Sequence, residues 1–499
     1  MIEVHQNKND FEYDIHSLVR AFYPGVDVTV SCPEENAGQK AAGEEDQEEC
    51  ILRIMITYGD NEISICLEEP SKDQQESSGK DAARKGCIAL GQDFDRAETK
   101  NVLKQLLYDL LSAYTGQKLP WGNLTGIRPT KIPMGLLEKG WKNTEIAAYM
   151  RDKYRCSSEK AALGIMIANR ERHLLKEFDY ARGYSLYVGI PFCPSICLYC
   201  SFSSSPISVW KDRVDEYLDA LEKEIVYGGG AYRDKILDTV YIGGGTPTTL
   251  EPYQMDRLLT LLEQNFDYSH VKEFTVEAGR PDSITKEKLE VLKEHGISRI
   301  SINPQTMNQK TLDLIGRKHT VRETADAFRL ARELGFDNIN MDLIVGLPGE
   351  EKPEVEHTMQ EVMGMGPDSI TVHSLAVKRA ARLSMFKDEY KELTFTNNME
   401  IMDMTSRYAA LGGLSPYYLY RQKNMAGNLE NVGYARTGKA GLYNILMMEE
   451  KQSILALGAG ASTKIVYPDG RIERVENVKD IKNYVERIDE MIDRKRSRL

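Results

Sequence analysis

The order of apolar and polar positions divides this chain into three stretches. From residue 185 to about 376, short apolar segments alternate with amphipathic stretches at helical spacing, which predicts repeated strand–helix units. The predicted strands are residues 185–190, 238–243, 273–278, 298–303, 338–345 and 369–374, with helices between them at 212–227, 253–264, 285–295 and 322–335. This α/β alternation predicts a parallel sheet that curls into a partial (β/α)6, TIM-like barrel.

The first 180 residues predict a smaller α+β region. Apolar residues alternate with polar ones over 51–58 and 62–67, on either side of Gly59-Asp60-Asn61, which predicts a β-hairpin. Two stretches poor in apolar residues, 34–49 and 69–86, are expected to be mobile loops. Leucines at helical spacing predict a helix over 96–116 that ends at Gly116, and further helices are expected at 132–139, 143–153 and 158–177.

The last stretch carries mainly helical patterns, at 394–411 and 476–495. We therefore expect an N-terminal α+β region over 1–180, a barrel over 181–380 and a mostly helical C-terminal domain over 381–499. A length of 499 residues is consistent with several domains.

Composition restricts where the chain works and what it binds. There is no apolar run long enough to span a membrane and no signal-peptide pattern at the N-terminus, so a cytoplasmic location is expected. The net charge of −12 argues against a general nucleic-acid-binding surface.

Three cysteines give the strongest chemical signal. Cys193, Cys197 and Cys200 stand in C-x3-C-x2-C spacing directly after the first predicted barrel strand. Three thiolates would hold a 4Fe–4S cluster with one iron left open. A structural zinc site usually takes four protein ligands, and a disulfide framework suits small secreted domains. The spacing therefore favours an iron–sulfur cluster over both alternatives.

Other polar or glycine residues follow the later predicted strands. Gly243-Gly244-Gly245-Thr246 ends the second strand, and glycines there let a ligand approach the backbone closely. A carboxylate at a barrel mouth, such as Glu277, can bind an ammonium group. Asp342 interrupts an apolar strand, where burial of a lone charge is costly and a functional role is favoured. Because parallel strands in a barrel end on one face, these side chains are expected to share one site.

Together, these residues resemble the radical S-adenosylmethionine (SAM) superfamily. Within it they resemble the oxygen-independent coproporphyrinogen III oxidase family, in its longer coproporphyrinogen dehydrogenase-like branch. The segments that carry the resemblance are Leu186–Cys193, Gly243–Thr248, Gln305 with Arg317 twelve residues later, Asp342–Pro348, Tyr417–Asn428 and Leu457–Ala461.

The resemblance implies a role for each matching residue. Cys193, Cys197 and Cys200 would bind the cluster, and Tyr187 would reach over it toward SAM. Gly244, Gly245 and Thr246 would line the methionine of SAM, with Glu277 at its ammonium and Arg317 at its carboxylate. Gln305 and Asp342 would hold the ribose, while His373 and Ala376 would flank the adenine.

The resemblance also implies a reaction and its partners. A flavodoxin or ferredoxin would supply an electron, and one or two SAM molecules would be used to remove a hydrogen atom from a propionate side chain of coproporphyrinogen III. Loss of carbon dioxide would then leave a vinyl group, giving protoporphyrinogen IX. Lys378, Arg379, Arg421 and Lys423 are candidates to bind the carboxylates of this tetrapyrrole.

Three departures from the family pattern keep alternatives open. Phe202 stands where the oxidases carry a further cysteine, Gly189 stands where a histidine is usual, and Glu430-Asn431-Val432-Gly433-Tyr434 lacks the Phe-Gln pair of the oxidases. The first of these is closer to the heme chaperones of the family. A heme-binding chaperone and a methyltransferase that acts on heme therefore remain alternative functions.

Overall fold

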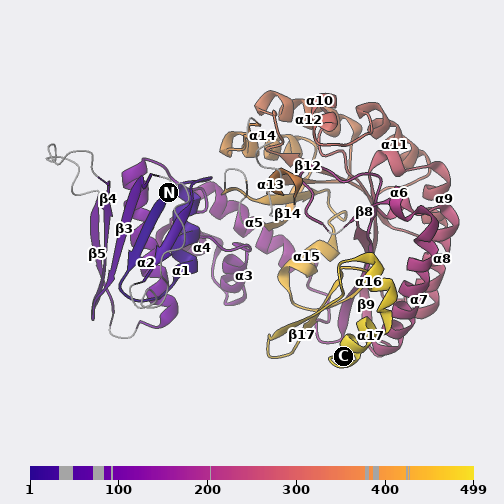
Figure 1. Cartoon of the computed structure of the whole chain (residues 1–499), viewed down its shortest axis with the longest axis horizontal. Helices are drawn as coiled ribbons and strands as arrows, with labels where there is room; N and C mark the ends of the chain where they lie inside the picture. Colours follow the sequence, from indigo (N-terminus) through magenta and orange to yellow (C-terminus); the bar gives the residue numbers. More distant parts are fainter. Residues whose placement is uncertain are drawn as a thin grey trace. The chain divides into compact units, whose positions relative to one another are not determined.

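The computed structural model describes residues 1–32, 49–70, 84–91, 94–202, 204–376, 381–385, 393–422, 425 and 428–499. The chain forms two compact units, Met1–Ala168 and Asn169–Leu499 (Figure 1). The expected mobile loop at 34–49, except for its last residue, and most of the one at 69–86 lie outside the described residues, and the end of the latter is part of a strand, Lys85–Ala89. Among the described helices, none is both long and apolar enough to cross a membrane.

The first unit is a five-stranded sheet with helices. Its strand order is β2-β1-β3-β4-β5, where β1 (Ile2–Gln6) pairs in parallel with β2 (Val28–Ser31) and with β3 (Leu52–Tyr58). The predicted hairpin is β3 with β4 (Glu62–Glu68), and β5 (Lys85–Ala89) follows. Helices α1 (Glu12–Phe22) and α2 (Arg96–Thr115) bury their apolar faces in this unit's core, and α2 ends at Gly116 in the left-handed conformation. Helices α3 (Lys131–Glu138), α4 (Asn143–Tyr154) and α5 (Ser158–Leu174) complete the predicted set.

The second unit is built on the predicted barrel strands. Six parallel strands lie side by side in chain order: β6 (Gly183–Ile190), β9 (Ile236–Gly244), β10 (Glu273–Gly279), β11 (Arg299–Ile302), β12 (Ile339–Val345) and β13 (Ser369–Ser374). Their residues are buried nearly throughout, as expected when both faces of a parallel sheet are covered. The connecting helices are α7 (Val214–Ala231), α8 (Pro252–Asn265), α9 (Lys286–Glu294), α10 (Gln309–Leu314), α11 (Val321–Glu333) and α12 (Lys352–Met365). Figure 1 shows several of these helices along the outer side of the strands.

Strands from the C-terminal region extend the sheet at both edges, which the periodicity did not predict. On one edge β15 (Asn431–Ala435) pairs antiparallel with β13, and β14 (Ser415–Tyr420) follows it. On the other edge β16 (Ser453–Leu457) pairs in parallel with β6, followed by β17 (Ser462–Val466) and β18 (Ile472–Glu476). Eleven strands in all form one sheet. The region expected to be a separate domain therefore shares its sheet with the barrel.

Helices form the rest of the C-terminal region. The predicted helix at 394–411 begins at Met399 and is α14 (Met399–Leu411), and α15 (Leu442–Glu449) follows. The single helix expected at 476–495 is instead two, α16 (Ile481–Glu486) and α17 (Ile488–Arg496), which meet at Arg487. Residue 476 still belongs to β18, because Glu476 pairs with Ser462.

Candidate active site at the ends of the barrel strands

The three cysteines lie in the loop that follows β6. Cys193 lies in β7 (Phe192–Cys193), which pairs with β8 (Ser205–Pro206), so the loop closes on itself. Cys197 is buried, Cys193 and Cys200 are half-buried, and all three are free thiols. Burial raises the pKa of the Cys200 thiol to about 11 and also raises that of Cys193. A metal bound here would therefore displace protons from thiols.

The glycine loop after β9 packs directly against the cysteine loop. The Gly245 amide donates to the Ile190 carbonyl at 2.8 Å, and the Thr246 amide donates to the Phe192 carbonyl at 2.7 Å. A Cβ atom on Gly245 would lie 2.4 Å from the Phe192 carbonyl oxygen, and Gly244 has a φ of +111°. Only glycine suits these two positions, so the sequence of this loop is fixed by its close approach to the cysteine loop.

Glu277 lies near the end of β10 beside a group of tyrosines. The Tyr241 hydroxyl donates to its Oε1 atom, and Tyr241 stacks on Tyr187 and on Tyr443 with ring centroids 6.3 Å and 4.5 Å apart. Burial raises the pKa of Glu277 to about 7, although the hydrogen bonds from Tyr241 and the Gly244 backbone oppose the rise. A cation next to this carboxylate would favour its charged form.

Gln305 and Arg317 present buried polar atoms with no partner among the described residues. Gln305 has a φ of +69°, and its backbone N–H donates to the Asp342 backbone carbonyl at 3.0 Å. Its side-chain Oε1 atom has no hydrogen bond among the described residues. Arg317 is buried and donates from Nη1 to the carbonyls of Asn303 and Pro304, while its Nε has no acceptor. Such orphaned groups are costly unless a ligand satisfies them.

Asp342 is held as an anion inside the barrel. Its Oδ1 atom accepts from Asn340 Nδ2 at 2.7 Å and lies 3.9 Å from His373 Nε2. Burial by itself would raise the pKa of Asp342, but the hydrogen bonds from His373, Asn340 and Thr371 outweigh it and leave the pKa below the ordinary value. On its other side His373 Nδ1 lies 3.3 Å from the Tyr420 hydroxyl. The carboxylate can therefore accept further hydrogen bonds from a ligand.

Two further predicted site residues, Ala376 and Arg421, lie just after β13 and β14. Ala376 follows β13 and forms a β-bridge with Met425. Arg421 is buried, and its Nη2 donates to the backbone carbonyl and the side chain of Asn428 at 3.0 and 2.7 Å. Lys378, Arg379 and Lys423 lie outside the described residues.

Sequence reasoning missed residues that support the predicted ones. Asn340 orients Asp342, Tyr241 bonds to Glu277, and Tyr420 contacts His373. Asn340 carried the same signal as Asp342, a polar residue in an apolar strand two positions earlier. The role of Tyr420 depends on β14, a strand that the periodicity did not predict.

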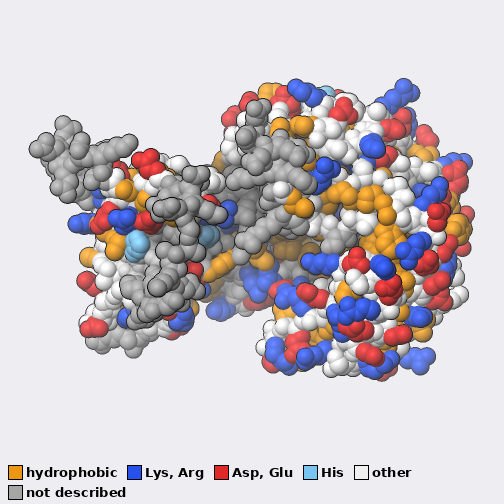
Figure 2. Space-filling view, viewed as in Figure 1, with side chains coloured by type: hydrophobic (Ala, Val, Ile, Leu, Met, Phe, Trp, Pro, Cys, Tyr) orange, Lys and Arg blue, Asp and Glu red, His pale blue; other side chains and the backbone are white. Residues whose placement is uncertain are grey.

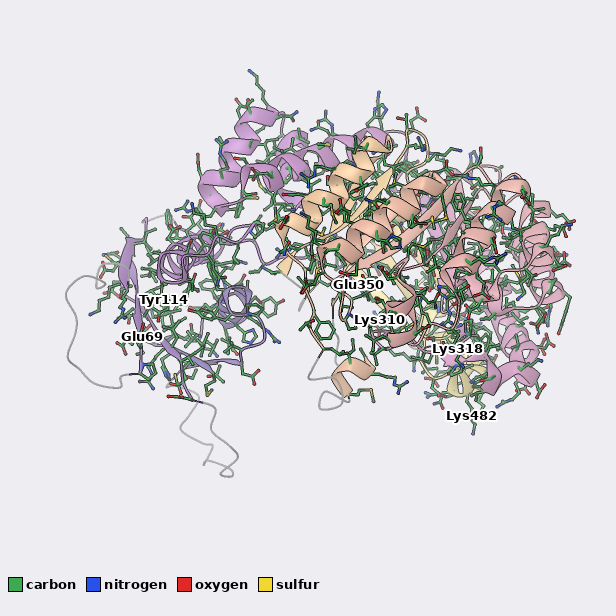
Figure 3. The ribbon with its side chains drawn as sticks, turned by 90° about the horizontal axis from the view of Figure 1, so that it is seen from above. Glu69, Tyr114, Lys310, Lys318, Glu350 and Lys482 are labelled. Carbon is green, nitrogen blue, oxygen red and sulfur yellow. The ribbon has the colours of Figure 1, made fainter. Side chains whose placement is uncertain are left out.

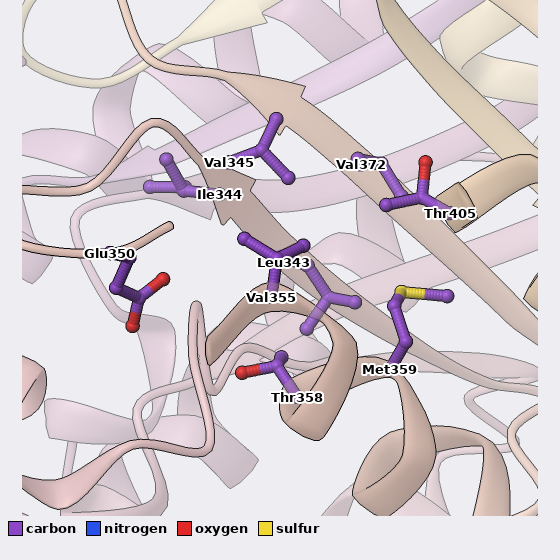
Figure 4. Close-up of a pocket in the computed structure, with 9 residues that line it drawn as sticks. All are labelled: Leu343, Ile344, Val345, Glu350, Val355, Thr358, Met359, Val372 and Thr405. Atoms are coloured by element: carbon purple, nitrogen blue, oxygen red, sulfur yellow. The ribbon is translucent and has the colours of Figure 1, made fainter. Parts of the chain in front are cut away.

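A small cavity elsewhere in the second unit is a packing void. It has a volume of about 10 Å³ and lies between β12 and helix α12, lined mostly by apolar side chains such as Leu343, Val355 and Met359 (Figure 4). That volume barely accommodates one water molecule. It is therefore no candidate for a substrate site.

The donor set fits a cluster with SAM better than it fits a single ion. Among the described residues, no three His, Cys, Asp or Glu side chains are arranged to hold one metal ion. A cubane does not need such convergence, because each thiolate binds a different iron. The glycine loop packs directly against the cysteine loop, and Gln305 Oε1 and Arg317 Nε have no hydrogen-bond partner among the described residues.

Comparisons with known proteins show the family to which the chain belongs. Residues 187–362 match the family model of the Radical SAM superfamily. The chain is 41% identical over 403 residues to the oxygen-independent coproporphyrinogen-III oxidase-like protein HemZ of Bacillus subtilis, which covers 80% of each chain. It is 40% identical over 195 residues to the heme chaperone HemW of B. subtilis, covering 39% of this chain and 51% of the relative.

A solved structure gives the same result for the fold. The coproporphyrinogen III oxidase HemN of Escherichia coli superimposes with a TM-score of 0.52 at 26% identity. The match covers 62% of this chain and 70% of that one. The fold of that part of the chain thus has a counterpart of known structure.

Proposed function

Because the chain belongs to the oxygen-independent coproporphyrinogen-III oxidase-like family of radical SAM proteins, we propose that it oxidatively decarboxylates coproporphyrinogen III. The similarity to HemZ over four fifths of both chains is the observation that carries this proposal. Family membership implies a 4Fe–4S cluster and SAM.

Different residues of the site would bind the cluster and the parts of SAM. Cys193, Cys197 and Cys200 would hold the cluster, and the loop from Gly243 to Thr246 would contact the methionine of SAM. Glu277 would pair with the ammonium, because a cation favours its ionised form despite burial. When bound, the cluster and SAM supply one-electron chemistry able to remove a hydrogen atom from an unactivated carbon.

The remaining groups would fix the nucleoside. The unsatisfied Nε of Arg317 is suited to a carboxylate, and Gln305 Oε1 and the Asp342 carboxylate are suited to the ribose hydroxyls. His373 lies on β13 and Ala376 just after that strand, where the two residues would flank the adenine. Burial of this side of the site excludes water and holds the reacting groups in one orientation.

Only two of the four propionates of coproporphyrinogen III are converted. Each of these two would lose one hydrogen atom from its β-carbon and one further electron, and its C–C bond to the carboxylate would break to release carbon dioxide and leave a vinyl group. A one-electron donor such as a flavodoxin or ferredoxin would start each cycle, and a one-electron acceptor would take the substrate electron.

A heme-binding chaperone is the second candidate. Phe202, which stands where the oxidases have a cysteine, is 72% exposed beside the cluster loop. An exposed aromatic ring can pack on a flat tetrapyrrole, and the chaperone HemW is 40% identical over the shared segment.

An anaerobic assay separates the two functions. The reconstituted protein would be given SAM, a low-potential reductant and coproporphyrinogen III, with 5′-deoxyadenosine and porphyrin products followed by mass spectrometry. We expect protoporphyrinogen IX with matched deoxyadenosine, loss of both in Cys197→Ser, and neither loss in Cys87→Ser, which changes an exposed cysteine of the first unit. Stoichiometric heme binding without vinyl product would favour the chaperone.

A further inference from the structure

A buried arginine joins the cysteine loop to the end of β10. Arg280 is 3% exposed, and its Nη1 donates to both the backbone carbonyl and the hydroxyl of Ser195, at 3.1 and 2.6 Å. Ser195 lies between Cys193 and Cys197. The arginine therefore holds the backbone of the segment that separates two of the thiols.

The arginine is itself held in one orientation. Its Nε and Nη2 atoms donate to the two carboxylate oxygens of Asp282 at 2.9 and 2.7 Å, a bidentate arrangement that fixes the plane of the guanidinium. Asp282 is two residues away in the short 3-10 helix Pro281–Ser283, and its side chain is 19% exposed. All three nitrogens of the guanidinium thus donate hydrogen bonds, Nε and Nη2 to Asp282 and Nη1 to Ser195.

The other side of the loop is fixed by the segment after α10. The Ser195 hydroxyl donates to the Gly316 carbonyl at 3.0 Å, and the Leu198 amide donates to the Ile315 carbonyl at 2.9 Å. The hydroxyl accordingly accepts from Arg280 and donates to Gly316, so it connects two barrel loops through the cysteine segment. If either Arg280 or the Gly316 carbonyl moved away, the Ser195 hydroxyl would lose one of its two hydrogen bonds.

We propose that Arg280 is a positioning residue that, with Asp282 and Ser195, presets the cysteine loop for the cluster before iron binds. This inference rests on the proposed function in that the loop is taken as the cluster site. It adds residues that neither bind the cluster nor contact SAM. Hydrogen bonds that involve a charged group are stronger than those between neutral groups. Loss of the Arg280 guanidinium should therefore open the cysteine loop measurably.

Alkylation of the iron-free full-length chain tests the proposal without the cluster. Because Cys197 is buried, its reaction with iodoacetamide requires the loop to open, while exposed Cys87 is an internal reference. We expect Arg280→Gln to speed alkylation of Cys197 relative to Cys87 by about tenfold. Arg280→Lys keeps the charge but not the fork, so it should behave like Arg280→Gln.

Matched variants control for general damage. Ser195→Ala removes only the bridging hydroxyl and should speed alkylation several-fold with an unchanged melting temperature. Arg257→Gln removes another arginine that pairs with two carboxylates, Asp219 and Glu222, and should leave the rate at that of the wild type. Wild-type rates in both Arg280→Gln and Ser195→Ala, or full rescue by Arg280→Lys, would overturn the proposal.

Iron uptake separates this inference from the function on which it rests. We expect the wild type to take up about four irons per chain on anaerobic reconstitution, and Arg280→Gln to take them up more slowly and to give a broadened electron paramagnetic resonance spectrum when reduced. If the wild type binds no iron, the proposed function fails, whereas the alkylation rates still decide the role of Arg280. Equal uptake and identical spectra would count against the positioning role.

Discussion

The ammonium of Lys495 lies 2.7 Å from a carboxylate oxygen of Glu224, and both side chains are fully buried. The pair joins the last helix, α17, to α7. The carboxylate also accepts from the Gly458 amide at 2.8 Å and the Tyr484 hydroxyl at 2.6 Å, while Lys495 donates to Asn477 at 2.6 Å. A Cβ added at Gly458 would lie 2.6 Å from the Gly189 carbonyl oxygen, so the residue that donates to this carboxylate also packs closely against the end of β6.

Lys495→Met should lower the free energy of unfolding of the second unit by about 3 to 5 kcal/mol, because it leaves Glu224 charged and buried without its partner. Urea unfolding followed by circular dichroism measures the change. Lys482→Met is the matched control: Lys482 extends outward from α16 and is 64% exposed (Figure 3), so its loss should cost less than about 1 kcal/mol. A similar cost for both variants would contradict the role of the buried pair.

Glu277 should make the iron-free protein less stable as the pH rises. Its pKa of about 7 in the folded chain lies above the ordinary value of 4.5, so folding favours the protonated form. Ionisation of Glu277 lowers the free energy of unfolding. This loss is absent below about pH 4, grows between pH 4 and 7 and is complete above pH 7, where it amounts to about 3 kcal/mol.

Glu277→Gln removes this titration while keeping an acceptor for Tyr241. Urea unfolding at several pH values should show the variant gaining stability relative to the wild type from pH 5 to pH 8. Glu290→Gln, on α9 with a side chain that is 43% exposed, should show no such trend. A constant difference between Glu277→Gln and the wild type across this range would rule out the raised pKa.

Asn340→Ala should weaken SAM binding more than it slows turnover. Asn340 donates to Asp342 and Ser301 and accepts from Ser369 at 3.0 Å, and Arg299 donates to that serine in turn. Loss of the bond to the carboxylate should raise the KM for SAM about tenfold, if Asp342 binds the ribose. Asn338→Ala is the control, since the Asn338 side-chain oxygen has no hydrogen bond. An unchanged KM would refute the positioning of Asp342 by Asn340.

Gly245→Ala should prevent normal assembly of the site, because the added Cβ would lie 2.4 Å from the Phe192 carbonyl oxygen, which is backbone and cannot move freely. Loss of iron uptake on reconstitution would be the measured effect. Gly230→Ala, in α7, meets no atom within 4 Å and should stabilise the chain by about 0.5 to 1 kcal/mol. Normal iron uptake by Gly245→Ala would show that the two loops can separate.

Charged side chains of the second unit are mixed on the face seen in Figure 2, where Lys and Arg lie among Asp and Glu. The net charge of −12 is therefore not concentrated there as one acidic field.

In the first unit, Glu69 and Tyr114, both labelled in Figure 3, are joined by a hydrogen bond of 2.7 Å.

The sequence by itself determined the six barrel strands and the positions of the motifs at their ends. This was possible because buried parallel strands are continuous apolar runs, and because a cysteine triplet or a Gly-Gly-Gly turn is a local pattern. Glu277 and Asp342 were identifiable for a similar reason, since each is a carboxylate in or beside an apolar strand.

Only the tertiary structure decided which residues support those motifs. Arg280 and Ser195 are 85 residues apart, and Glu224 and Lys495 are 271 apart, so no local pattern links them. The edge strands β14–β18 were equally hidden, because their pairing with β13 and β6 depends on partners distant in sequence. The period of apolar residues indicates which face of a segment is buried. The segments that pack against that face are determined only in the tertiary structure.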